Sequence, residues 1–270
     1  MVIDFHTHVF PDALAGRAVR SLEESINYVY TPVTDGTLSG LIGHMDSTGV
    51  DISVIQPVVT KPSQTRGVNE WSAAAQSDRI VAFGGVHPRG KDYKSDIDRA
   101  VELGLRGLKF HAEYQDFDVD DARMLRIYDY ALSRGLILLH HAGADPAYRP
   151  PFRSSPKQFA NVADAMKGGV IVAAHFGGHD QWDDVERYLA GKDIYLDTSM
   201  GFDYFSTEQF VRITRAHGAD KVLFATDSPW SDAGREMERL MAAPLSESEK
   251  ELILGANAAR LLKIGARRPG

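Results

Sequence analysis

Short apolar runs of β-type residues recur along the whole chain and alternate with longer amphipathic segments. Several runs are apolar at nearly every position, as in 52–55 and 170–174. This composition is typical of parallel strands that are buried on both faces. The pattern predicts eight strands, near residues 2–7, 52–57, 80–86, 106–111, 136–140, 170–175, 193–197 and 222–226.

Between these runs, apolar residues repeat at the spacing of three and four positions that marks one face of a helix. Gly49 follows such a segment and predicts its C-terminal end. Ser246 and Glu249 have the spacing of a capping box, which predicts the start of a late helix. The pattern predicts helices over 37–47, 121–134, 156–167, 182–190, 206–217, 246–254 and 256–262.

Strands that alternate with helices over the full length predict an α/β fold, a (β/α)8 TIM barrel formed by a single domain over residues 1–265. An open doubly wound sheet is the structural alternative, but no glycine-rich fingerprint follows the first strand. We expect 9–36 to be a long loop after the first strand, and such loops on barrels are lids or specificity loops. We expect residues 266–270 to be a flexible basic tail.

The composition narrows the classes of function. The chain has 270 residues, 43% of them hydrophobic and 25% charged, as in ordinary globular proteins. The net charge of −7 argues against nucleic acid or an anionic membrane as the main partner. The absence of cysteine excludes thiolate metal sites, so a metal must be held by His, Asp, Glu or a modified Lys. We see neither a signal peptide nor an apolar run of about 18 residues, and we expect a cytoplasmic protein.

The candidate chemistry lies in the histidines. His6 and His8 end the first apolar run, and residues two positions apart on a strand point to the same face, about 6–7 Å apart. Two imidazoles at that spacing can hold one metal ion. Lys109 lies near the end of the fourth predicted strand, and Asp227 ends the eighth. The C-terminal strand ends form the active-site face of a barrel, and seven of the ten histidines fall there: His6, His8, His87, His111, His140, His141 and His175.

Each of these residues has an ordinary structural explanation when it is taken alone. One of the adjacent pair His140 and His141 must face the helices as a packed, hydrogen-bonded core residue. We expect His44, His179 and His217 to be structural or surface residues. So many polar groups at the same end of successive strands nevertheless indicate a shared function.

Six short motifs carry a resemblance to a known family. The set resembles the amidohydrolase superfamily, and its finer pattern resembles the amidohydrolase-2 branch, which includes decarboxylases related to aminocarboxymuconate-semialdehyde decarboxylase. The motifs extend over nearly the whole chain: IDFHTH at 3–8, GLKFH at 107–111, HAG at 141–143, AHFGG at 174–178, ATDSP at 225–229 and NAARL at 257–261.

By position, the resemblance implies one divalent metal ion, usually zinc in the family, held by His6, His8, His141 and Asp227. It implies that His175 lies beside the metal-bound water, as a second ligand or proton shuttle. Lys109 leaves an alternative open. In binuclear amidohydrolases the lysine of the fourth strand is carbamylated and bridges two metal ions, of which His141 and His175 would hold the second.

The resemblance therefore implies a metal-dependent hydrolase or decarboxylase that acts on a small, carboxylated or cyclic substrate through a metal-activated water. Asp227, His175 and Lys109 are the candidate catalytic residues, and His111 and Arg149 the candidate substrate contacts. A TatD-like phosphoesterase or nuclease is one alternative, although that group carries an acidic ligand at the position of Lys109. A non-catalytic ligand-binding barrel is another. Homodimerisation is plausible by resemblance.

Overall fold

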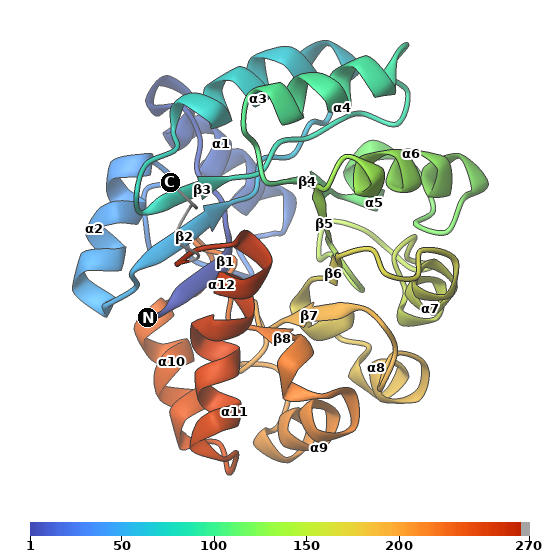
Figure 1. Ribbon diagram of the computed structural model, residues 1–270. Coiled ribbons are helices and arrows are strands. Elements are labelled where there is room, and N and C mark those ends of the chain that lie inside the picture. Colours follow the sequence, from blue (N-terminus) through green and yellow to red (C-terminus); the bar gives the residue numbers. More distant parts are fainter. Residues whose placement is uncertain (266–270) are drawn as a thin grey trace.

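Eight short strands form the centre of the molecule in the computed structural model, which describes residues 1–265 (Figure 1). Strands that are consecutive in the chain are neighbours within each sheet, and the strand pairs within residues 1–265 are all parallel. The strands are β1 Ile3–Thr7, β2 Ile52–Ile55, β3 Ile80–Ala82, β4 Gly107–Phe110, β5 Ile137–His140, β6 Ile171–Ala173, β7 Tyr195–Asp197 and β8 Val222–Leu223.

Contacts beyond the regular ladders join the first three strands to the other five. Between β3 and β4, Gly84 and Leu108 form a parallel bridge. Between β8 and β1, the backbone N–H of Phe5 donates to the carbonyl of Phe224 at 2.9 Å. The eight strands therefore close on themselves, which confirms the predicted (β/α)8 barrel and excludes the open sheet.

The helices surround this barrel (Figure 1). Each predicted helix is found, and Ser246 and Glu249 form the predicted capping box at the start of α11. A π-helical turn, Leu252–Ala256, connects α11 to α12. Helices α1, α3, α4, α5 and α10 were not predicted. The helices are α1 Asp12–Ser25, α2 Leu38–Thr48, α3 Thr65–Ala74, α4 Tyr93–Glu102, α5 Ala112–Gln115, α6 Ala122–Ser133, α7 Pro156–Ala165, α8 Trp182–Tyr188, α9 Thr207–His217, α10 Ala233–Ala242, α11 Glu247–Glu251 and α12 Asn257–Leu262.

The segment 9–36 differs from its prediction, because it contains the 14-residue helix α1 instead of a loop alone. Ala15 and Val19 are buried on one side of this helix. Leu14 and Ala18 lie beside them and line a cavity. Ala15, Ala18, Val19 and Leu22 have the spacing i, i+3, i+4 and i+7 of one amphipathic face, so the periodicity of this helix was present in the sequence and was missed.

Large apolar side chains fill the interior of the barrel. The rings of Phe5 and Phe83 are fully buried and meet edge to face, with centroids 5.8 Å apart. Gly107 leaves room for this pair, because a Cβ atom there would lie 2.4 Å from the ring of Phe83. Leu262 of α12 belongs to the same apolar cluster as Phe5 and Leu139, so α12 covers the N-terminal end of the barrel, which faces the viewer in Figure 1.

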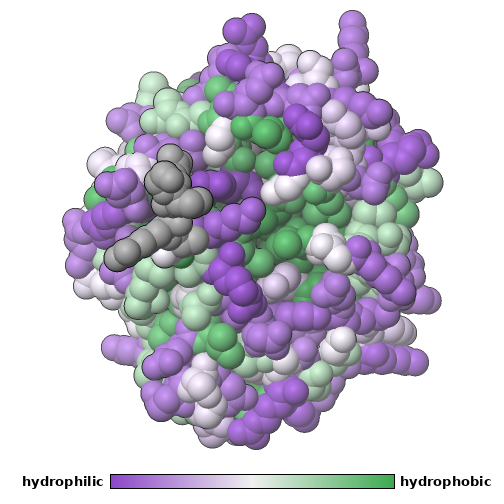
Figure 2. Space-filling view, in the orientation of Figure 1, coloured by the Kyte–Doolittle hydropathy of each residue, from purple (hydrophilic) through white to green (hydrophobic). Residues whose placement is uncertain are grey.

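The end of the molecule that α12 covers is mostly hydrophilic at its surface, and apolar residues gather toward the middle of that face (Figure 2). Between residues 1 and 265, no helix combines the length and the apolar character needed to cross a membrane. The predicted tail, 266–270, lies outside the described residues.

Candidate metal centre and substrate cavity

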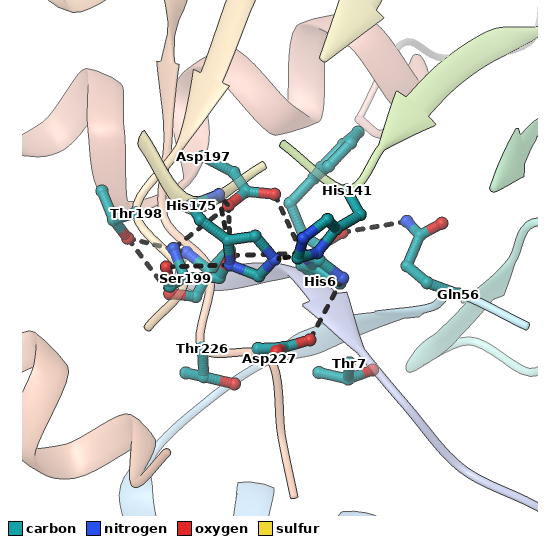
Figure 3. Close-up of polar contacts among 12 residues, drawn as sticks. His6, Thr7, Gln56, His141, His175, Asp197, Thr198, Ser199, Thr226 and Asp227 are labelled. Atoms are coloured by element: carbon teal, nitrogen blue, oxygen red, sulfur yellow. Dashed lines mark hydrogen bonds and ion pairs between the residues drawn. The ribbon is translucent and has the colours of Figure 1, made fainter. Parts of the chain in front are cut away.

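The two histidines of the first strand meet Asp227 at the C-terminal end of the barrel. The register of β1 against β2 shifts between Asp4 and Thr7, and a bulge of this kind re-aims the side chains around it. The Nε2 atoms of His6 and His8 lie 3.1 Å apart. Oδ1 of Asp227 lies 3.2 Å from the first and 3.0 Å from the second, and Figure 3 shows Asp227 pointing toward His6. Three donor atoms therefore converge on one point.

The other ring nitrogen of His6 contacts Asp197, the last residue of β7, and Ser199, which lies two residues beyond it. His6 Nδ1 donates to Oδ2 of Asp197 at 3.0 Å and lies 3.2 Å from Oγ of Ser199. Burial alone would raise the pKa of Asp197, but attraction to His6 holds that pKa below its usual value. A carboxylate that orients a ligating histidine in this way is common around metal sites. We did not predict Asp197, although it ends a predicted strand just as the histidines do.

A second pair of imidazole nitrogens lies beside the first group. His175 Nε2 and His141 Nδ1 are 3.0 Å apart. The backbone N–H of His175 donates to Oδ1 of Asp197 at 3.0 Å, and Trp182 Nε1 donates to the carbonyl of His175 at 3.1 Å. The φ angles of His175 and Asp227 are 55° and 64°. Such left-handed conformations cost about 1–3 kcal/mol each and concentrate at functional sites.

Lys109 points into the barrel between these groups. Its Nζ atom donates to His6 Nε2 at 2.7 Å, and the residue is 1% exposed. Burial lowers the pKa of Lys109 to about 8, although attraction to Asp227 and Asp197 opposes the change. A neutral amine is therefore more accessible at this position than on the surface.

The protonation states at the centre suit metal coordination. Burial lowers the pKa of His8 to about 4 and that of His175 to about 3, so both rings are neutral at pH 7. Burial would raise the pKa of Asp227, but attraction to His6 and the hydrogen bond from His8 hold it well below its usual value. Metal ligands must be deprotonated, and neutral imidazoles with a carboxylate suit zinc or manganese. The donor set therefore fits a divalent metal ion.

His111, a predicted substrate contact, lies in the wall of the same cavity. Its Nε2 atom donates to Oδ2 of Asp145 at 3.1 Å. Its ring stacks on Tyr114, with centroids 3.7 Å apart, and on His141, with centroids 4.2 Å apart. This stack limits how the ring of His141 can turn. Asp145 and Tyr114 were not singled out from the sequence.

Two expectations for the site are not supported. Arg149 is exposed and does not line the cavity, because the segment around it lies on the surface. His179, expected to be a structural or surface residue, is buried, lines the cavity and shares a hydrogen bond of 3.1 Å with the hydroxyl of Tyr30.

The remaining histidines, His44, His87, His140 and His217, make the contacts of structural residues. His87 is buried, and its Nδ1 atom accepts a hydrogen bond from the backbone N–H of Arg89 at 3.1 Å. His140 is buried and stacks on Phe110 with centroids 5.0 Å apart. It is packed as expected, but neither ring nitrogen has a hydrogen-bond partner within residues 1–265. His44 and His217 both bond to backbone groups of neighbouring elements.

A cavity of about 570 Å³ lies over the C-terminal ends of the strands. Small-molecule sites have volumes of about 300–1,000 Å³. The donor residues line one part of it, and α1 and α3 line another. The residues of the donor part are His8, Lys109, His141, His175 and Asp227.

A closed (β/α)8 barrel with imidazole, carboxylate and lysine groups at its C-terminal strand ends defines the class of TIM-barrel enzymes with a metal-dependent active site. The Amidohydro_2 family model, described as amidohydrolase, matches residues 3–264. The chain belongs to this amidohydrolase family, as its motifs suggested. It is an enzyme of the metal-dependent hydrolase and decarboxylase type.

Solved structures agree on the fold. An uncharacterised TIM-barrel protein from Bordetella bronchiseptica is 19% identical, with a TM-score of 0.77 over 97% of this chain and 98% of that one. A 5-carboxyvanillate decarboxylase from Novosphingobium aromaticivorans with bound manganese is 14% identical, with a TM-score of 0.73 over 98% and 97%. A probable 2-pyrone-4,6-dicarboxylic acid hydrolase from Acinetobacter baumannii is 15% identical, with a TM-score of 0.67 over 97% and 99%. No curated protein matches the sequence significantly.

Proposed function

We propose that the chain hydrolyses or decarboxylates a small carboxylated or cyclic substrate with the help of a divalent metal ion. The observation that carries the proposal is the convergence of His6 Nε2, His8 Nε2 and Asp227 Oδ1 within 3.2 Å of one another at the wall of a cavity. We assign these three residues as metal ligands and His141 as the fourth. The names of two proteins with similar folds, a decarboxylase and a probable hydrolase, support both reaction types.

Zinc is the proposed metal, since neutral imidazole and carboxylate suit it. Manganese is the alternative, because the similar decarboxylase holds it. A bound ion would supply positive charge that polarises a carbonyl or carboxylate oxygen and makes water more acidic. A second ion, held by His141 and His175 and bridged by carbamylated Lys109, is the alternative stoichiometry.

Side chains of the protein can carry out the remaining tasks, which are proton transfer, stabilisation of charge and positioning of the substrate. The carboxylate of Asp227 is ionised and lines the cavity, so the oxygen that does not bind the metal, Oδ2, can accept a proton and return it to a leaving group or carbanion. Once it has taken up a proton, His175 can donate a hydrogen bond from Nε2 to an oxygen on which charge develops. Lys109 Nζ can donate to the same oxygen or to a substrate carboxylate, and His111 lines the cavity beside it. Asp197 fixes the ring of His6 through Nδ1.

Lys109 also weighs against the phosphoesterase alternative, which needs an acidic ligand on the fourth strand. A non-catalytic barrel would not require five donor groups in one cavity wall, with His6 directly behind them. The cytoplasmic location and the homodimer stay predictions.

The first experiment is elemental analysis of protein purified without chelator, for the wild type and for His6→Ala. We expect close to one zinc per wild-type chain and almost none in His6→Ala. His44→Ala is the matched control, since His44 bonds to the backbone of Ala233 away from the centre, and it should keep its metal. Retention of metal by His6→Ala would refute the ligand assignment.

The reaction type needs a second readout. Carboxylated aromatics, lactones and small amides are offered to the metal-loaded enzyme in water enriched in ¹⁸O. Label in the product carboxylate indicates hydrolysis, and released CO₂ with an unlabelled product indicates decarboxylation. Release of neither product from any member of these classes would contradict the proposed substrate class.

A further inference from the structure

The cavity has a second part that the proposed chemistry does not use. Between α1 and α3, its wall is formed mainly by apolar side chains, with the uncharged polar residues Ser21, Thr60 and Gln64 among them. We call this part the apolar arm. Its residues are Leu14, Ala18, Leu22, Val58, Val68 and Trp71. Figure 1 shows α1 and α3 on the same side of the barrel, and both line the cavity that contains Asp227 and Lys109.

Helix α1 has one more apolar stripe than its packing on the barrel requires. Ala15 and Val19 are 0% and 5% exposed, so they attach the helix to the body of the protein. Leu14, Ala18 and Leu22 recur at intervals of four, widen the same apolar face to one side and line the cavity. Leu14 is 43% exposed, and Ala18 and Leu22 are partly exposed. Apolar side chains that face a cavity and stay accessible to solvent are typical of a binding surface.

The charges of the cavity are confined to the metal-centre side. Among residues 1–265, Lys109 is the one lysine or arginine that lines the cavity, and the lining carboxylates are Asp145 and Asp227. None of the six residues of the apolar arm carries a charge, and the polar residues that line the cavity near them, Ser21, Thr60 and Gln64, are uncharged. A second carboxylate of a substrate would find no cation there, and burial of a charge without a counter-charge is costly.

We propose that the substrate has one carbonyl or carboxylate group at the metal centre and an uncharged apolar group, an alkyl chain or an aromatic ring, in the apolar arm. This inference rests on the proposed function, because it takes the end of the substrate that faces Asp227 and Lys109 from it. It adds the chemical class of the other end. Compounds with a charged group at the far end are excluded as good substrates.

The test uses straight-chain alkyl hydroxamic acids, whose head group binds divalent metals, and measures their affinity for the metal-loaded full chain by calorimetry. The series runs from acetohydroxamate to octanohydroxamate. Each methylene that enters an apolar site strengthens binding by up to about fourfold. We expect a gain of about two- to fourfold per methylene until the arm is filled. An octanohydroxamate with a terminal carboxylate should bind at least about tenfold more weakly than its methyl-ended counterpart.

Two substitutions on α1 locate the effect. Ala18→Trp fills the apolar arm and should reduce binding of octanohydroxamate to the level of acetohydroxamate, which itself should change by less than about twofold. Ala13→Trp is the matched control, since Ala13 is exposed on the same helix and does not line the cavity. It should leave the whole series unchanged.

The outcomes separate this inference from the proposed function. If acetohydroxamate and metal bind but chain length has no effect on affinity, the apolar arm is not a substrate site and the metal centre stands. If longer chains gain affinity equally in wild type and Ala18→Trp, the gain arises elsewhere and the inference is wrong. If neither metal nor acetohydroxamate binds, the proposed function fails and the inference fails with it. The wild-type series decides the matter even where Ala18→Trp does not fold.

Discussion

Glu236 should make a contribution to the free energy of unfolding that decreases as the pH rises. It lies on α10, is 1% exposed and accepts a hydrogen bond from Oγ of Ser231, which follows the cavity residue Trp230. Its other carboxylate oxygen has no hydrogen-bond partner within the described part of the chain. Burial raises the pKa of Glu236 from 4.5 to about 7, although the hydrogen bond from Ser231 opposes the change. The folded protein therefore holds this proton more tightly than the unfolded chain.

The size of the effect follows from the two pKa values. A carboxyl group whose pKa is higher in the folded state adds stability below its unfolded pKa of 4.5, and that stability is lost as the pH rises through about 7. At 1.36 kcal/mol per pH unit, the loss amounts to about 3 kcal/mol. Glu236→Gln carries a neutral amide at every pH and should not show this loss. Relative to wild type, the variant should gain about 3 kcal/mol between about pH 4 and pH 8.

The assay is urea denaturation of both proteins at several pH values, with the free energy of unfolding taken from each curve. Other titrating groups contribute equally to both proteins, so the difference between them isolates Glu236. Glu238→Gln is the control, because Glu238 is exposed on the same helix, and its difference from wild type should stay flat. A difference for Glu236→Gln that stays constant within about 0.5 kcal/mol over this range would refute the reasoning.

Three further predictions concern the centre and the core. Asp227→Asn should keep part of the metal but lower kcat by at least about 100-fold, because the proton acceptor is lost; steady-state kinetics with metal analysis checks this, and near-native turnover would remove Asp227 from the role. Lys109→Ala should leave one metal per chain by elemental analysis and raise KM, whereas a fall from two metals to one would establish the carbamate bridge. Phe83→Ala should lower the free energy of unfolding in urea by about 3–5 kcal/mol, because its ring fills the barrel against Phe5; a loss below about 1 kcal/mol would contradict that packing.

The barrel could be predicted from the sequence because each of its parts leaves a local signal. Buried parallel strands are apolar on both faces, and the chain in 170–174 shows this without reference to any other segment. Once the fold is known, the C-terminal strand ends must meet at one face. The sequence therefore predicts that His6, His141 and Asp227 lie at the same end of the barrel, although they are far apart in the chain.

The hydrogen bonds within the metal centre have no comparable local pattern in the sequence. The hydrogen bond between His6 and Asp197 joins residues 191 positions apart, and no spacing rule predicts which nitrogen of which ring it uses. The pairing of His141 Nδ1 with His175 Nε2 depends in the same way on backbone detail, including the left-handed conformation of His175. Arg149 and His179 show the same limit, since position in a loop does not tell whether a side chain turns inward.

Helix α1 separates what apolar periodicity can predict from what it cannot. Ala15, Ala18, Val19 and Leu22 have the spacing of one amphipathic face, so the helix itself could have been predicted from the sequence. Periodicity does not tell how that face is shared between core and cavity. Ala15 and Val19 are buried against the body of the protein, whereas Leu14, Ala18 and Leu22 line the cavity. This division depends on where the barrel places the helix, so the side chains that should decide which compounds bind cannot be told from core residues by their pattern alone.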